Sequence, residues 1–158
     1  MRRAVTIALM CIIMIFTLTA CGERTPLTSA DFESMATSEG LTITDLTAES
    51  DDSEGIENEI YAENTAENWA VDFAVLSDET AAQQAFANLK TVFEASAGNA
   101  TATTSVNVGN YQSYSISSNG QYMYVSRTGN TLIYTQTESS NKESVKDFIS
   151  KLEDATKQ

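Results

Sequence analysis

The chain has 158 residues, a formal net charge of −13 and no histidine. Such an acidic protein repels nucleic acid and anionic lipid, and without histidine it has neither Ser-His-Asp nor Cys-His catalysis nor a histidine-ligated zinc site. Both cysteines, Cys11 and Cys21, lie in the first 21 residues, so the rest of the chain has no thiol for catalysis, metal binding or a disulfide.

The first 21 residues have the pattern of an export signal that ends in a lipobox. Two arginines precede an apolar stretch over residues 4–16, and the segment closes with Leu18-Thr19-Ala20-Cys21. An apolar helix of this length spans roughly 20 Å, less than the ~30 Å hydrocarbon core of a bilayer. We therefore expect residues 1–20 to be a cleaved signal peptide rather than a permanent membrane span.

Acidic residues are concentrated in the part of the chain that follows this signal. Residues 23–79 contain 16 acids and one base, Arg24, whereas residues 80–158 contain six of each. Residues 21–27 form only a short link, which reaches about 20 Å at most. The remaining residues, 28–158, suit a single domain.

The first predicted helix runs from about Ser29 to Glu39. Thr28 is a suitable N-cap with Asp31 at the third helical position, and Gly40 ends the helix where a left-handed residue is favoured.

Three strands are predicted next, over residues 41–46, 56–62 and 69–76. The third has the clearest alternation, because Trp69 and every second residue after it are apolar and point to one side. We expect Trp69 to lie in the core.

A long helix follows, with Ser77 as its predicted cap and Gly98 at its end. Apolar residues at helical spacing predict its buried stripe. This stripe consists of Ala82, Ala85, Phe86, Leu89, Val92 and Phe93.

The next forty residues predict a meander of four strands, over 103–108, 111–117, 121–127 and 131–137. Gly-Asn or Asn-Gly separates each pair of runs, which is a strong hairpin signal. A final helix follows with a Ser140–Glu143 capping-box pattern. Its predicted buried residues are Val145, Phe148, Ile149 and Leu152.

The element order α-βββ-α-ββββ-α predicts an α+β fold. We expect an antiparallel sheet of about seven strands with the amphipathic helices packed on one face.

Several segments resemble small lipoproteins of clostridial-type Gram-positive bacteria. They are the lipobox, the Thr-Ser-x-Asp-Phe opening at 28–32, the Phe-x-Val-Leu-Ser-Asp-Glu segment at 73–79 and the Tyr-rich stretch 124–134. The resemblance implies that Cys21 is the first mature residue and carries acyl chains, palmitate among them. It implies a location on the outer face of the cell membrane, and it supplies no activity and no site residues.

The acidic loop at residues 49–59 raises the question of calcium, which prefers clustered oxygen ligands. An EF-hand aligned on Gly55 fails, because its twelfth position is Tyr61 rather than glutamate. An irregular site would use Asp51, Asp52, Glu54 and Glu57, but a solvated acidic loop is the preferred interpretation of the pattern.

Three further sequence patterns raise functional hypotheses. Ser139-Ser140-Asn141-Lys142 matches the Ser-x-x-Lys motif of penicillin-recognising enzymes, but the supporting motifs are missing, so chance explains it. Arg127 is expected to pair with an acid across the sheet. Tyrosines and serines on one face of the meander either bind a glycan or peptide or form the solvent side of the sheet. These residues are Tyr111, Ser113, Ser115, Ser117, Tyr122 and Tyr124.

The sequence predicts no catalytic residues, no metal site and no cofactor. We expect a non-enzymatic binding or envelope-accessory domain, anchored to the membrane through lipid on Cys21, with an envelope protein or glycan as partner and no nucleic acid. The alternatives are a cation- or small-molecule-binding accessory of a transporter and a hydrolase that uses carboxylates alone.

Overall fold

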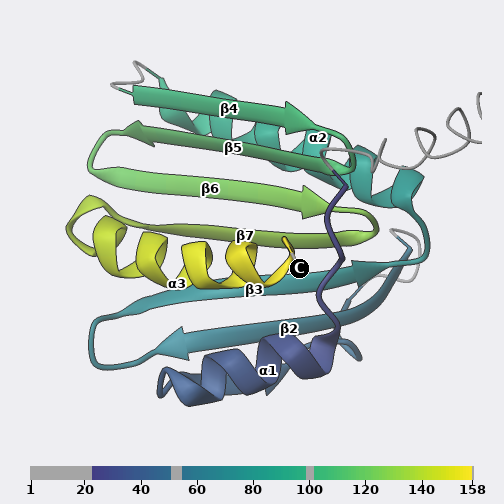
Figure 1. Cartoon of the computed structure of the whole chain (residues 1–158). Helices are drawn as coiled ribbons and strands as arrows, with labels where there is room; N and C mark the ends of the chain where they lie inside the picture. The colour runs from purple at the N-terminus through teal and green to yellow at the C-terminus, as the bar shows by residue number, and fades with distance from the viewer. Residues whose placement is uncertain (1–22, 51–54, 99–101, 158) are drawn as a thin grey trace, which may run out of the picture.

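The computed structural model describes residues 23–50, 55–98 and 102–157. The chain forms a seven-stranded antiparallel sheet with three α-helices among these residues, which confirms the predicted α+β order. The strands lie in the order β1-β2-β3-β7-β6-β5-β4 (Figure 1). The predicted signal peptide and Cys21 fall outside the described residues.

The helices are α1 Ser29–Ser38, α2 Glu79–Ala97 and α3 Lys142–Ala155, and a 3-10 turn over Ser139–Asn141 precedes α3. The strands are β1 Thr42–Asp45, β2 Ile56–Asn64, β3 Trp69–Leu76, β4 Ala102–Val108, β5 Tyr111–Ser118, β6 Gln121–Thr128 and β7 Thr131–Glu138.

Helix α2 joins the two halves of the sheet. The chain leaves β3 in the middle of the sheet, follows α2 to the far edge and returns through the meander, so that β7 pairs with β3. The four meander strands are consecutive antiparallel neighbours, as the hairpin signals predict. The acidic first part of the chain and the meander, whose strands carry one base and one acid, Arg127 and Glu138, therefore form opposite halves of one sheet.

The predicted helix boundaries are confirmed at α1 and corrected at two other places. Thr28 and Asp31 form the expected capping box. The N-cap of α2 is Asp78 rather than Ser77, because the Asp78 carboxylate accepts a hydrogen bond from the backbone of Ala81. The Ser140 capping box is not formed, since the 3-10 turn occupies that segment.

The helices cover both faces of the sheet, so the expected placement on one face is wrong for α2. In β3, Trp69, Val71 and Phe73 pack with α1 and α3, whereas Ala74 and Leu76 pack with α2. Successive residues of a strand point to opposite faces. Figure 1 shows α1 and α3 in front of the sheet and α2 behind it.

Aromatic rings dominate the core between the sheet, α1 and α3. Phe32 of α1 stacks on Phe73 with 4.8 Å between the ring centroids, and Trp69 packs near Phe148 of α3. The predicted position of Trp69 in the core is confirmed. On α2, however, Val92 is 57% exposed, because the buried face of this helix continues through Phe93 to Ala97.

Each face of the sheet leaves one half without a helix. Helices α1 and α3 contact β1, β2, β3 and β7, while α2 contacts β3, β7, β6 and β5 on the other face. The areas covered least by helices are therefore β1–β2 on the α2 side and β4, whose residues are all exposed, at the opposite edge. The first of these areas borders a groove.

Candidate ligand-binding groove

A groove of about 540 Å³ runs between α2 and strand β2. Its floor is apolar and consists of side chains from the two central strands, Ala74 and Leu76 of β3 and Leu132 of β7. Helix α2 supplies one wall, and Ser50 and Glu59 lie on the other side. This volume is in the range of sites that bind small molecules.

The carboxylate of Glu59 is fixed at the polar side of the groove. The hydroxyl of Tyr134 donates to Glu59 Oε1 at 2.7 Å, and the hydroxyl of Ser50 donates to Glu59 Oε2. The backbone of Glu59 is held as well, because its amide donates to Thr47 Oγ1 at 3.0 Å. A carboxylate held in this way keeps lone pairs free for a further donor.

A second acidic side chain, Asp72, shares this face of the sheet. Asp72 lies opposite Tyr61 on one side and opposite Tyr134 on the other. Glu59 pairs with Ala74, two residues further along β3, so the two acidic residues are diagonal neighbours about 7–8 Å apart. Burial, and secondarily the charge of Glu59, raise the pKa of Asp72 to about 7.

The Glu59 carboxylate places a negative charge beside the apolar floor of the groove, and Asp72 lies next to the groove without lining it. Such a site favours a ligand that carries a positive charge beside an apolar body, because the charge replaces lost solvation and the body buries apolar surface. Among the described residues, no group of three acidic, histidine or cysteine side chains has the geometry to hold a metal ion.

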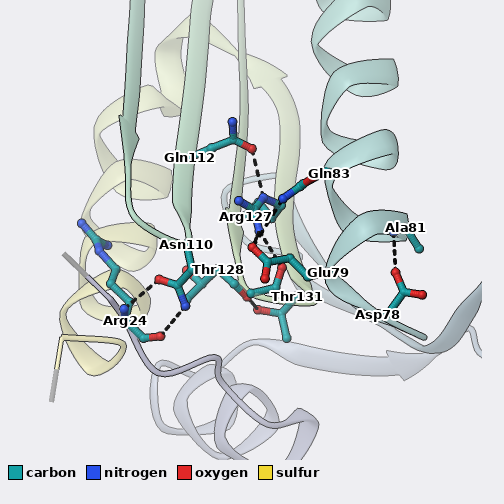
Figure 2. A network of polar contacts seen from close by, with 11 residues as sticks. Arg24, Asp78, Glu79, Ala81, Gln83, Asn110, Gln112, Arg127, Thr128 and Thr131 are labelled. Atoms are coloured by element: carbon teal, nitrogen blue, oxygen red, sulfur yellow. Dashed lines mark hydrogen bonds and ion pairs between the residues drawn. The ribbon is translucent and has the colours of Figure 1, made fainter. Parts of the chain in front are cut away.

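Arg127, singled out from the sequence, lies in a different network on the same face of the sheet, the face covered by α2. It is 2% exposed, and its guanidinium donates to Glu79 Oε1 at 2.9 Å, to Gln112 Oε1 at 3.0 Å and to the Gly129 carbonyl at 2.9 Å (Figure 2). Arg127 thus pairs with an acid, as expected, but the acid is on α2 and not across the sheet. The network joins the start of α2 to the meander.

The predicted tyrosine and serine face exists, but most of it is buried. Tyr111 and Tyr124 both donate to Glu153 of α3, and Lys142 contacts Ser117 and the ring of Tyr122. Burial, above all other causes, raises the pKa of Tyr122 to about 12. These tyrosines hold α3 on the sheet, so the hypothesis of a ligand-stacking surface is wrong for them.

The remaining sequence candidates do not join the groove. Lys142 of the Ser-x-x-Lys pattern has Ser117 as its hydrogen-bond partner. In the calcium hypothesis, Asp51, Asp52 and Glu54 lie outside the described residues, and Glu57 belongs to β2.

The sequence did not single out Glu59, Asp72 or Tyr134. Asp72 carried a usable signal, because it is the one acid inside the otherwise apolar strand 69–76. Glu59 carried no comparable signal in the sequence, since it is one of nine acids between residues 45 and 67.

Comparisons with protein-family models, curated proteins and solved structures found no significant match. Among the described residues, no helix is long and apolar enough to cross a membrane.

Proposed function

We propose that this protein is a lipoprotein, attached through Cys21 to the outer face of the cell membrane, with a non-enzymatic domain that binds a small organic cation. The lipobox and the short apolar stretch before it support the attachment. Two acyl chains hold a protein stably at a bilayer, whereas one is marginal. A role beside a transporter or another envelope component fits such a location.

The observation that carries the binding role is the Glu59 carboxylate fixed above the apolar floor of the groove. Ser50 and Tyr134 orient it, so a ligand does not have to order it on binding. A primary ammonium group would pair with Glu59, and an alkyl body would lie on Ala74, Leu76 and Leu132.

The binding role is tested with a series of alkylammonium ions from butyl to octyl, titrated into the detergent-solubilised full-length protein and followed by NMR. Each added methylene is expected to increase affinity about threefold to fourfold, at about 0.8 kcal/mol per group. Glu59→Gln should weaken binding about tenfold or more, because a charge-assisted hydrogen bond is lost.

Glu63→Gln is the matched control, since Glu63 lies on the same strand and face as Glu59 but does not line the groove. Equal losses in the two variants would indicate general attraction to an acidic surface and would contradict the groove as the site.

The attachment is tested separately by replacing the lipobox cysteine, Cys21→Ser. The native protein should incorporate a labelled fatty acid and fractionate with membranes, and the variant should do neither. Membrane fractionation of the variant at the native level would contradict the proposed anchor.

A hydrolase that uses carboxylates alone is the second candidate, favoured by one observation. Glu59 and Asp72 are neighbours, and the raised pKa of Asp72, about 7, suits a general acid. A release assay with a mixture of cell-wall glycans separates this candidate from the first: activity lost in both Glu59→Gln and Asp72→Asn would favour the hydrolase.

A further inference from the structure

We propose that one defined end of the domain rests against the bilayer, because the chain is fixed to that end three residues after Cys21. This anchor end consists of the β4–β5 turn, the β6–β7 turn and the C-terminus of α3. The far end consists of the turns at 65–68 and 119–120 and the start of α3. The inference rests on the proposed lipid attachment and adds the orientation that the attachment imposes.

The first contact is between Arg24 and the β4–β5 turn. The side-chain amide of Asn110 accepts a hydrogen bond from the backbone N–H of Arg24 and donates one to its carbonyl, both at 2.8 Å (Figure 2). One side chain thus satisfies both backbone groups of Arg24. This pairing fixes the position and the direction of the chain where it enters the domain.

The side chain of Arg24 and the next residue add contacts to the same end. The guanidinium lies over the ring of Tyr111, 3.4 Å from its centroid, a cation–π contact. Its Nη1 donates to Thr156 Oγ1 at 3.5 Å, and the amide of Thr25 donates to the Thr156 carbonyl at 2.8 Å. The C-terminus of α3 and the β4–β5 turn therefore hold this segment together.

Pro26 and Leu27 complete the fixed segment. A Cβ atom at Gly129 would lie 2.7 Å from Pro26 Cγ, so only glycine leaves room for the proline at the β6–β7 turn. Leu27 is buried in the core beside Phe32. Residues 24–27, expected from the sequence to be part of a tether, are packed against the domain.

The reach of the link then sets the orientation. Three residue steps from Cys21 to Arg24 span about 11 Å at most, whatever their conformation. A strand of nine residues such as β2 is about 30 Å long, so with the anchor end held this close the far end reaches the membrane only if the whole domain lies flat on it, which repulsion between the acidic domain and anionic lipid opposes. The far end therefore points away from the bilayer and is the surface that an envelope partner meets first.

The orientation is tested by energy transfer from single labelled cysteines to headgroup-labelled lipid in vesicles that carry the full-length lipidated protein. Past residue 21 the sequence contains no other cysteine, so Lys157→Cys at the anchor end and Thr65→Cys at the far end are unique sites. Both positions are exposed. We expect the label at 65 to lie about 25 Å further from the membrane than the label at 157.

Loosening the clamp, meaning the contacts of Arg24 with Asn110, Tyr111 and Thr156, should reduce this difference without releasing the protein. Arg24→Ala combined with Asn110→Ala leaves Cys21 intact and lengthens the free link as far as Thr25, so the two label distances should move closer together. Asn107→Ala, on β4 outside the clamp, is the matched control and should keep them apart. Thermal unfolding of each variant confirms that the domain is folded.

The outcomes separate the two proposals. Membrane-bound protein with equal label distances in the unmodified clamp would overturn the orientation and leave the lipid anchor intact. Protein recovered in the soluble fraction, with Cys21 free of lipid, would overturn both.

Discussion

Arg127 and Asp72 are ionisable side chains placed in opposite halves of the same sheet, and their surroundings differ sharply. Arg127 is almost fully buried, and three acceptors surround its guanidinium. Asp72 has no hydrogen bond from a described residue that lowers its pKa; burial and the nearby Glu59 charge raise it instead. Hydrogen-bond acceptors thus compensate the burial of the Arg127 guanidinium in one half of the sheet. The half-buried carboxyl of Asp72 in the other half has no such compensation.

The difference matches the distribution of charge along the chain. Between Glu94 and Arg127 the sequence contains no acidic or basic residue, so the strands before Arg127 offer it only neutral neighbours, and its acidic partner is Glu79 at the start of α2. The first half holds most of the acids, and the charge of Glu59 contributes to the raised pKa of Asp72. Uncompensated buried charge is typical of functional sites rather than of structural ones. The contrast is consistent with a structural role for Arg127 and supports the proposal that the groove beside Glu59 binds a ligand.

The largest expected effect is from Arg127→Met. The substitution removes the cation and leaves the Gln112 and Gly129 oxygens buried without a donor, so we expect a loss of about 2–4 kcal/mol in the free energy of unfolding. Urea denaturation measures it, with an unchanged m-value expected. Lys90→Met, on α2 with 40% of its side chain exposed, is the control, and a similar loss there would contradict a special role for Arg127.

Asp72→Asn should increase the free energy of unfolding, in contrast to Arg127→Met, and it should do so only at higher pH. The pKa of Asp72 is about 7 in the folded protein, against 3.8 ordinarily. The folded state therefore binds more protons between these values, and the contribution of Asp72 to stability falls as the pH rises from about 4 to 7. Above pH 7 the variant should be more stable by about 2 kcal/mol, because water still reaches part of this half-buried group.

The measurement is the difference in unfolding free energy between Asp72→Asn and the native protein at pH 4 and pH 8. It should be near zero at pH 4 and reach its full value at pH 8. Glu33→Gln, at an exposed position of α1, should show no such change. A difference for Asp72→Asn that does not vary with pH would mean that its carboxyl is ionised throughout.

Most of the fold could be predicted from the sequence because it depends on local patterns. The hairpin dipeptides, the Thr28 cap and the alternation of strand 69–76 each determine structure within a few residues. The face covered by α2 is not local: it depends on how the chain crosses from β3 to the far edge of the sheet. An amphipathic helix has the same pattern on either face.

The candidate groove was less predictable, for a related reason. Glu59 and Tyr134 are 75 residues apart in sequence, and only the pairing of β3 with β7 brings them together. The anchor contacts of Arg24 are equally distant, because Asn110 is 86 residues away. Long-range partners of single polar residues leave no periodic signal in one sequence.

Glu79→Gln should have a smaller effect than Arg127→Met, although both break the same ion pair. The side chain of Glu79 is 50% exposed, so its loss leaves no buried charge on its own side, and Arg127 keeps Gln112 and Gly129. We expect a loss of about 1 kcal/mol, part of it from the helix dipole at the first residue of α2. Glu94→Gln, in the exposed pair with Lys90, is the control and should change stability less.

If Glu79→Gln cost as much as Arg127→Met, the pair would have to be shielded from water as a unit. The asymmetry between the two partners is thus a direct measure of how deeply the meander half buries its one cation.

The smallest effect is expected where the meander half reaches the edge of the sheet. Val106 on β4 is 38% exposed, so Val106→Lys should change the unfolding free energy by less than about 0.5 kcal/mol. Ile116→Lys on β5, where the side chain is 4% exposed, should by contrast prevent stable folding. A small effect at Val106 would mean that the domain folds as well with a charged side chain on β4 as with a neutral one. A loss above about 2 kcal/mol would mean that another surface covers this strand in solution, since a lysine on an open edge keeps its hydration.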